Sequence, residues 1–123
     1  MIYGYVRVST QDQSVESQKN SISRYCIEQK LMVDEWIELE MSSRKSTAMR
    51  RIDELLDKLL PDDVVIASEL SRLGRSIKET LNTIETIVQD KLSRLILIKQ
   101  NLDLNPNAKN NVANKVLITI FSM

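Results

Sequence analysis

Apolar residues recur along the chain with two different spacings, which predict strands that alternate with helices. Alternating or continuous apolar runs, typical of strands, lie at residues 3–9, 31–39, 62–68 and 93–100. Apolar residues three and four positions apart, typical of amphipathic helices, lie at residues 15–30, 51–60 and 77–91. This alternation predicts an α/β fold: a three-layer sandwich around a central, mostly parallel sheet of four or five strands.

Three further segments do not fit this alternation. The cationic stretch 40–51 and the asparagine-rich stretch 101–111 are expected to be loops. The final segment, 110–123, reads as a helix whose apolar residues cover about half of its circumference, which favours a subunit interface; a buried terminal helix is the alternative. We therefore expect one α/β domain over residues 1–105 and the start of a long oligomerisation helix over residues 106–123.

The composition limits the chemistry that the chain can carry out. Its 123 residues include 42% apolar residues, enough for one core, and 17 basic residues balance 17 acidic ones. With one cysteine and no histidine, an internal disulfide, the usual zinc sites and histidine acid–base catalysis are excluded, and no metal is expected. No targeting peptide and no apolar run of about 20 residues is visible, so we expect a cytoplasmic protein without a membrane span.

Three short polar stretches carry the candidate chemistry. They hold Arg7 and Ser9 at the end of the first strand, the cluster Arg44, Lys45, Arg50 and Arg51, and the pair Arg72 and Arg75 after the third strand. The ends of strands one and three are neighbours in a parallel sheet, so several guanidinium groups are expected to surround one serine. Guanidinium groups fit the oxygens of a phosphoryl group, and this predicts a phosphate site with a nucleophile in it. A serine that merely caps a loop among solvated arginines is the structural alternative.

The sequences YVRVSTQDQ and SRLGRS, with an RR-I-D-x-L-L helix between them, resemble the catalytic domain of the serine recombinases, the resolvases and DNA invertases. The resemblance covers nearly the whole chain and implies a flavodoxin-like strand order. It implies that Ser9 attacks a DNA phosphodiester and forms a 5′-phosphoserine link with a free 3′-hydroxyl. No cofactor is required, because the covalent link conserves the bond energy. It further implies double-stranded DNA as the partner, a dimer on each site and a tetramer in the synaptic complex.

The resemblance also assigns roles to individual positions. Arg7, Arg72 and Arg75 match arginines that bind and activate the scissile phosphate, and Gln13 and Gln18 match polar positions beside them. A further family arginine precedes the second helix. The sequence MRRI offers Arg50 or Arg51 for it, and we choose Arg50, with Arg51 and Arg44 as additional phosphate-binding candidates.

One position departs from the family pattern. Many members have aspartate immediately before the first arginine of RLGR, where this chain has Ser71. Glu69 lies two residues earlier and would share a face with Ser71 if the strand continued, which makes it a candidate substitute. The departure leaves open a non-catalytic relative that only oligomerises. A flavodoxin-like phosphate-binding or receiver domain is a third possibility, but it would require acidic residues where this chain has arginines.

The family's proteins are longer than this chain. They continue the last helix through a glutamate–arginine pair into a DNA-binding domain, and the sequence contains neither. We therefore expect the catalytic and oligomerisation part of a larger recombinase or transposase.

Overall fold

A computed structural model describes residues 1–9, 15–41, 45–74 and 76–106, and at residues 8–9, 39–41 and 45–51 it describes the backbone only. The elements, in chain order, are β1 (Ile2–Ser9), α1 (Val15–Glu28), β2 (Glu35–Met41), α2 (Lys45–Lys58), β3 (Val64–Ala67), a 3-10 helix (Leu70–Arg72), α3 (Ile77–Glu85), a π-helical turn (Thr86–Asp90), β4 (Arg94–Leu97) and β5 (Leu102–Leu104). None of the described helices is long and apolar enough to cross a membrane.

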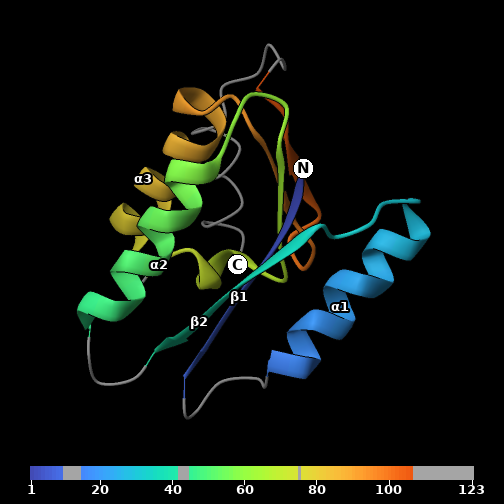
Figure 1. The fold of residues 1–123 in the computed structure, drawn as a ribbon, viewed down its shortest axis with the longest axis horizontal. Helices are drawn as coiled ribbons and strands as arrows, with labels where there is room; N and C mark the ends of the chain where they lie inside the picture. Colours follow the sequence, from blue (N-terminus) through green and yellow to red (C-terminus); the bar gives the residue numbers. More distant parts are fainter. Residues whose placement is uncertain (10–14, 42–44, 75, 107–123) are drawn as a thin grey trace.

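The strands form one sheet in the order β2-β1-β3-β4-β5. The first four run parallel, and β5 pairs antiparallel with β4. Helix α1 covers one face of the sheet, and α2 and α3 cover the other (Figure 1). The predicted three-layer α/β sandwich with a mostly parallel sheet is therefore confirmed.

Each face of the sheet has its own apolar core, because successive side chains of a strand point to opposite faces. Val6 and Ile66 pack with Ile22 and Cys26 of α1. On the other face, Tyr3, Tyr5, Val65 and Ala67 pack with Leu55 of α2, with Leu59 just after that helix and with Ile84 of α3. A fully buried leucine or isoleucine of this kind stabilises the fold by about 1.5–3 kcal/mol. The strand ends that carry the candidate residues are thus anchored on both faces.

The side chain of Trp36 on β2 explains why residue 4 is a glycine. A Cβ atom at this position would lie 2.5 Å from two carbons of the Trp36 ring on β2. Trp36 itself is half-buried, and the ammonium of Lys19 lies 5.3 Å from the centre of its ring. Glycine is therefore required here to let the indole lie flat on β1.

The structure corrects four details of the expected elements. The stretch 40–51 is not a loop throughout, since β2 continues to Met41 and α2 begins at Lys45. The stretch 101–111 contains the short strand β5. The helix expected at 77–91 changes into a π-helical turn after Glu85, and Ile77, expected on its apolar face, is 57% exposed. The second strand begins at Glu35 rather than at residue 31.

Two of these corrections have a local physical reason. Ala48, Met49 and the basic residues around them are good helix formers, so the polar character of the stretch did not prevent a helix. Strand β5 has only three residues at the edge of the sheet, too few for a pattern. Residues 107–123, which hold nearly all of the expected oligomerisation helix, lie outside the described residues, so the domain boundary at 105 stays a prediction.

Candidate active site

The site lies at the carboxyl ends of β1 and β3, where the strand order of the sheet reverses: β2 lies on one side of β1 and β3 on the other. Helix α1 connects β1 to β2 over one face of the sheet, and α2 connects β2 to β3 over the other, so the carboxyl ends of β1 and β3 flank a switch point (Figure 1). Open α/β sheets bind ligands at such points. Strand β3 pairs with β1 only as far as Ala67 opposite Tyr5, whereas β2 follows β1 to Met41 opposite Ser9. Arg7 and Ser9 therefore extend beyond the end of β3.

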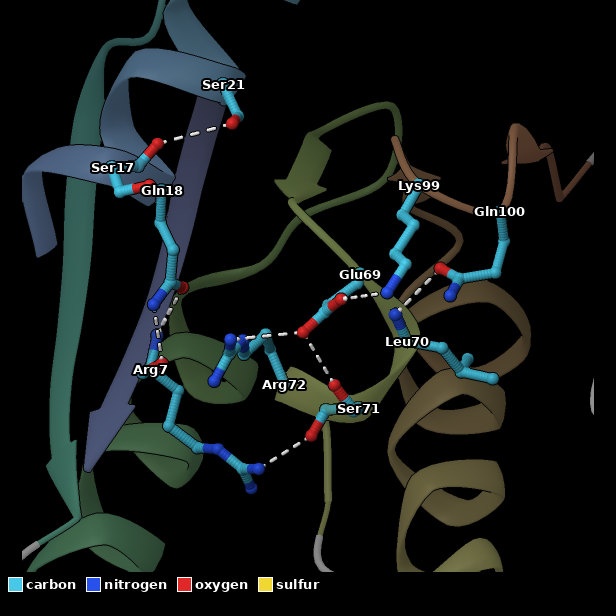
Figure 2. A network of polar contacts seen from close by, with 10 residues as sticks. All are labelled: Arg7, Ser17, Gln18, Ser21, Glu69, Leu70, Ser71, Arg72, Lys99 and Gln100. Carbon is cyan, nitrogen blue, oxygen red and sulfur yellow. Dashed lines mark hydrogen bonds and ion pairs between the residues drawn. The ribbon is translucent and has the colours of Figure 1, made fainter. Parts of the chain in front are cut away.

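Beside Arg7, where β3 no longer pairs with β1, the side chain of Gln18 from α1 makes the hydrogen bonds instead. The backbone N–H of Arg7 donates to Gln18 Oε1 at 3.3 Å, and Gln18 Nε2 donates to the Arg7 carbonyl at 2.9 Å. The side-chain amide thus pairs with Arg7 as a peptide unit would, and it is fully buried. Figure 2 shows this side chain reaching across from α1 to β1. The contact fixes the backbone at the end of β1, and direct contact of Gln18 with substrate stays a prediction.

The guanidinium of Arg7 reaches the loop after β3. Its Nη2 donates to the carbonyl of Ser71 at 2.6 Å, which joins the two strand ends across the switch point (Figure 2). Its Nε is buried and has no hydrogen-bond partner within the described residues. Arg7 is half-buried and shares a face with Tyr5, as the alternation of β1 predicted. The Nε–H group of Arg7 is therefore a donor without an acceptor among the described residues.

Glu69 organises the loop after β3. Its Oε1 accepts a hydrogen bond from the Ser71 hydroxyl at 3.0 Å and lies 3.1 Å from Arg72 Nη2, and its Oε2 lies 3.3 Å from Lys99 Nζ (Figure 2). Arg72 is only 4% exposed, so its charge is balanced mainly within the protein. Through Ser71, the same network extends to Arg7.

The environment of Glu69 favours its ionised form. Burial by itself raises the pKa of this carboxyl, but the hydrogen bonds from Ser71 and Lys99, together with the charges of Arg72 and Lys99, outweigh that effect and lower the pKa below its ordinary value. Glu69 is therefore a carboxylate at neutral pH. It can orient donors, but it has no proton to donate.

The sequence predicted that Glu69 and Ser71 lie together, but for the wrong reason. Strand β3 ends at Ala67, and residues Leu70–Arg72 form a 3-10 helix rather than a continuation of the strand. The tight turn folds the Ser71 hydroxyl back onto the carboxylate. Hydrogen bonding within the turn, and not strand alternation, joins the two residues.

The RLGR stretch then packs against the start of α3. A Cβ atom at Gly74 would lie 2.6 Å from the backbone nitrogen of Thr80 and 2.8 Å from its hydroxyl oxygen. Ser76 caps α3 by accepting a hydrogen bond from Glu79 N at 3.1 Å. Glycine is therefore required at position 74 to bring the arginine-bearing loop against the helix.

Three residues at the site were not predicted as part of it. Tyr5 is buried beside Arg7, its hydroxyl has no hydrogen-bond partner within the described residues, and burial raises its pKa well above the ordinary value. Its two-residue spacing from Arg7 was the signal. Lys99 and Gln100 follow β4, the neighbour of β3 in the sheet, and the end of that parallel strand could have indicated them.

Comparison with protein families matches residues 2–123 to the family described as Resolvase, N terminal domain. The chain belongs to this resolvase family. The match decides against the flavodoxin-like phosphate-binding or receiver domain. Since the family is defined by sequence, this assignment is independent of the geometry described above.

Individual proteins agree with the family match. A resolvase of Clostridium perfringens is 30% identical over 122 residues, which is 99% of this chain and 60% of that protein. The transposon Tn2501 resolvase of Escherichia coli is 28% identical over 109 residues, 87% of this chain and 55% of that protein. The chain thus spans little more than half the length of these relatives.

The fold is shared with a solved structure. The N-terminal catalytic domain of TP901-1 integrase superposes with a TM-score of 0.67 at 22% sequence identity, covering 98% of this chain and 90% of that one. At this identity the likeness concerns the fold alone.

The structure brings together five of the candidate site residues: Arg7, Gln18, Glu69, Ser71 and Arg72. Ser9 is the last residue of β1, and only its backbone is described. Arg50 and Arg51 lie within α2 rather than before it, which corrects the expected position, and their side chains lie outside the description. Gln13, Arg44 and Arg75 lie outside the described residues.

No metal site is derived at the strand ends. Within the described part of the chain, no group of three or more histidine, cysteine, aspartate or glutamate side chains is placed to hold a metal ion. Two guanidinium groups gather there: Arg72 pairs with the Glu69 carboxylate, and Arg7 donates to the Ser71 carbonyl. Guanidinium donors suit an oxyanion ligand.

Proposed function

We propose that this chain is the catalytic domain of a serine recombinase that cuts and rejoins double-stranded DNA at specific sites, with Ser9 as the nucleophile. The observation that carries the proposal is the state of Arg7. Its guanidinium is fixed at the switch point by Ser71, while its buried Nε has no partner within the described residues. Ser9 is two residues further along the same strand, and strand alternation predicts that it shares a face with Arg7.

Each step of the reaction exchanges one phosphodiester bond for another, so the number of such bonds does not change. Ser9 Oγ loses its proton and attacks the phosphorus, the bond from phosphorus to the 3′-oxygen breaks, and the 3′-oxygen leaves as a hydroxyl after it takes up a proton. The 5′-phosphate remains on the serine. A 3′-hydroxyl from the partner DNA then reverses the step and releases Ser9. The step needs no cofactor because no bond energy is lost.

The arginines supply the electrostatic part of this mechanism. Charge develops on the non-bridging oxygens of the phosphate as the serine attacks, and fixed guanidinium donors stabilise that charge. Arg7 and Arg72 are positioned for this by Ser71 and Glu69. Arg75, Arg50 and Gln13 are proposed as further contacts on the basis of their motifs, with Arg44 and Arg51 nearby in sequence.

The proposed partners are double-stranded DNA and further copies of the chain. By family membership, we propose a dimer on each recombination site and a tetramer in the synaptic complex. We also propose that the protein is cytoplasmic and is encoded by a bacterium, a phage or a mobile element. A module of the resolvase type that assembles on DNA without cutting it is the second candidate. The nearly complete burial of Arg72 beside Glu69 favours that candidate, because a buried and paired arginine offers little surface to a phosphate.

A covalent-adduct assay separates the two candidates. The protein at its full natural length would be incubated with supercoiled plasmids carrying fragments of the source genome, stopped with detergent and run on denaturing gels. We expect a protein–DNA adduct that Ser9→Ala abolishes and that Ser21→Ala, on the exposed face of α1, leaves unchanged. Specific DNA binding without an adduct, or an adduct at full yield from Ser9→Ala, would overturn the proposal.

A further inference from the structure

The loop that carries Ser71 and Arg72 is braced by the turn that joins β4 to β5. Ile98 N donates to the Ala67 carbonyl at 3.2 Å, and Lys99 N donates to the Ser68 carbonyl at 2.9 Å. The turn closes where Asn101 adopts a left-handed conformation with φ of 54°, which asparagine tolerates well. The turn therefore follows the chain of β3 past the end of the sheet.

Gln100 of this turn completes the start of the 3-10 helix. The first N–H groups of any helix lack partners within the helix, and a side chain at the N-cap commonly accepts from one of them. Glu69 is the N-cap here, has an extended backbone and makes no such hydrogen bond. The N–H of Leu70 instead donates to Gln100 Oε1 at 2.9 Å (Figure 2). The cap thus comes from a neighbouring element.

Because Gln100 accepts the hydrogen bond from Leu70 N, the carboxylate of Glu69 remains available to the site. Its carboxylate is directed to the Ser71 hydroxyl and to Arg72, and the Ser71 carbonyl in turn holds Arg7. Both arginines therefore depend on where the 3-10 helix starts. Lys99 adds an ion pair with Glu69, but its side chain is 70% exposed, so water and salt weaken this contact.

We propose that Gln100 is a positioning residue of the recombinase site, which fixes Glu69 and through it the guanidinium groups of Arg72 and Arg7 by accepting the Leu70 N–H. The proposal rests on the proposed function and deepens it. It assigns a role to a residue outside the motifs that carry the resemblance. A displacement of about 1 Å in positioned groups can cost as much as a hundredfold in rate, so the effect should be visible in cleavage.

The test compares Gln100→Met with wild type in the protein at its full natural length. Methionine keeps the length of the side chain but removes the strong acceptor. We expect the rate of adduct formation at saturating DNA to fall at least about tenfold, with DNA affinity unchanged within about twofold. Gln100→Glu keeps an acceptor oxygen and should cleave faster than Gln100→Met. Gln29→Met, at an exposed glutamine after α1, is the matched control and should behave as wild type.

The possible outcomes are distinct. A folded Gln100→Met protein that cleaves at the wild-type rate overturns the inference even if its melting temperature falls, because the hydrogen bond is then merely structural. If Gln100→Met does not fold, Gln100→Asn, whose acceptor is one carbon shorter, takes its place under the same criterion. Wild-type protein that binds DNA without forming an adduct overturns the proposed function and this inference with it.

Discussion

Arg72 combines a charge that the proposed reaction needs with an almost complete lack of exposure. Its Nη2 is held 3.1 Å from Glu69 Oε1, and a lysine could not reproduce the planar, fork-shaped set of donors that a guanidinium presents. We expect Arg72→Lys to lower the rate of cleavage at least about tenfold, or about 1.4 kcal/mol, with little change in DNA binding. Adduct gels and mobility shifts at one salt concentration measure both; an equal loss of binding would identify a simple phosphate clamp.

Glu69 should link stability to pH. Its pKa is lower in the folded protein than its ordinary value near 4.5, so the folded state gains stability above that value and loses it as the pH falls through the folded pKa. We expect the free energy of unfolding, measured with urea, to fall more in wild type than in Glu69→Gln as the pH falls below about 4.5. An identical acid dependence in the two proteins would show that the network does not hold the charge of Glu69 in solution.

The same residue should matter for cleavage. If Glu69 orients Arg72 in place of the family aspartate, Glu69→Gln should slow adduct formation markedly, because the amide keeps the size of the side chain and loses its charge. Ser71→Asp should be tolerated, since it restores the family pattern beside Arg72. Full activity of Glu69→Gln would reduce Glu69 to an ordinary ion pair.

Individual site residues were predictable only where a periodicity or a motif marked them. Arg7 and Ser9 follow from strand alternation, and Arg72 follows from the RLGR motif. The roles of Lys99 and Gln100 could not be predicted, because they depend on how the end of β4 lies beside β3 in three dimensions. The amide of Gln18 was expected near the phosphate, and its pairing with the backbone of Arg7 becomes visible only with the register of β3.

At the scale of elements, the end of α1 offers a clean test. Leu31 N donates to the Cys26 carbonyl at 2.7 Å and Lys30 N to the Ile27 carbonyl at 3.3 Å, which is the Schellman arrangement, with Lys30 in the left-handed region at φ 59°. Glycine has no Cβ and is preferred there. We expect Lys30→Gly to raise the free energy of unfolding by about 0.5–1 kcal/mol, measured by urea denaturation. A lower stability would show that the turn does not strain Lys30.

The accuracy of the predicted elements followed the length of their patterns. Helix α1 and strands β1, β3 and β4 have sustained apolar patterns, and the sequence placed them within a few residues. Helix α2 extends six residues further toward its amino end than predicted, because its first turns are polar and carry no apolar stripe. A three-residue edge strand such as β5 is stabilised by its pairing with Leu95, Ile96 and Leu97 and has no local pattern of its own.

At the scale of the whole molecule, the order of strands and helices creates the site. A chain that alternates strands and helices and reverses direction at β1 must bring the ends of β1 and β3 together, which is why the convergence of Arg7 with the Ser71–Arg72 loop was predictable before any distance was known. How the guanidinium groups are divided between Glu69 and Ser71 was not predictable, since it depends on turn geometry.

The apolar final segment leads to a prediction about assembly. Its residues Val116 and Ile120 belong to an apolar arc wider than one core requires, and exposed patches of that size are generally covered by a partner. In the protein at its full natural length, we expect Val116→Glu or Ile120→Glu to give folded monomers in analytical ultracentrifugation. Unfolded variants would instead assign the arc to the core of the same subunit.

The central claim is that Ser9 forms the covalent bond to DNA. The most direct measurement is to isolate the protein–DNA adduct, digest the DNA with nucleases and the protein with protease, and identify the phosphorylated residue by mass spectrometry. We predict a 5′-phosphate on Ser9 and a free 3′-hydroxyl at the broken strand. A phosphate on any other residue, or attachment through the 3′ end, would contradict the account.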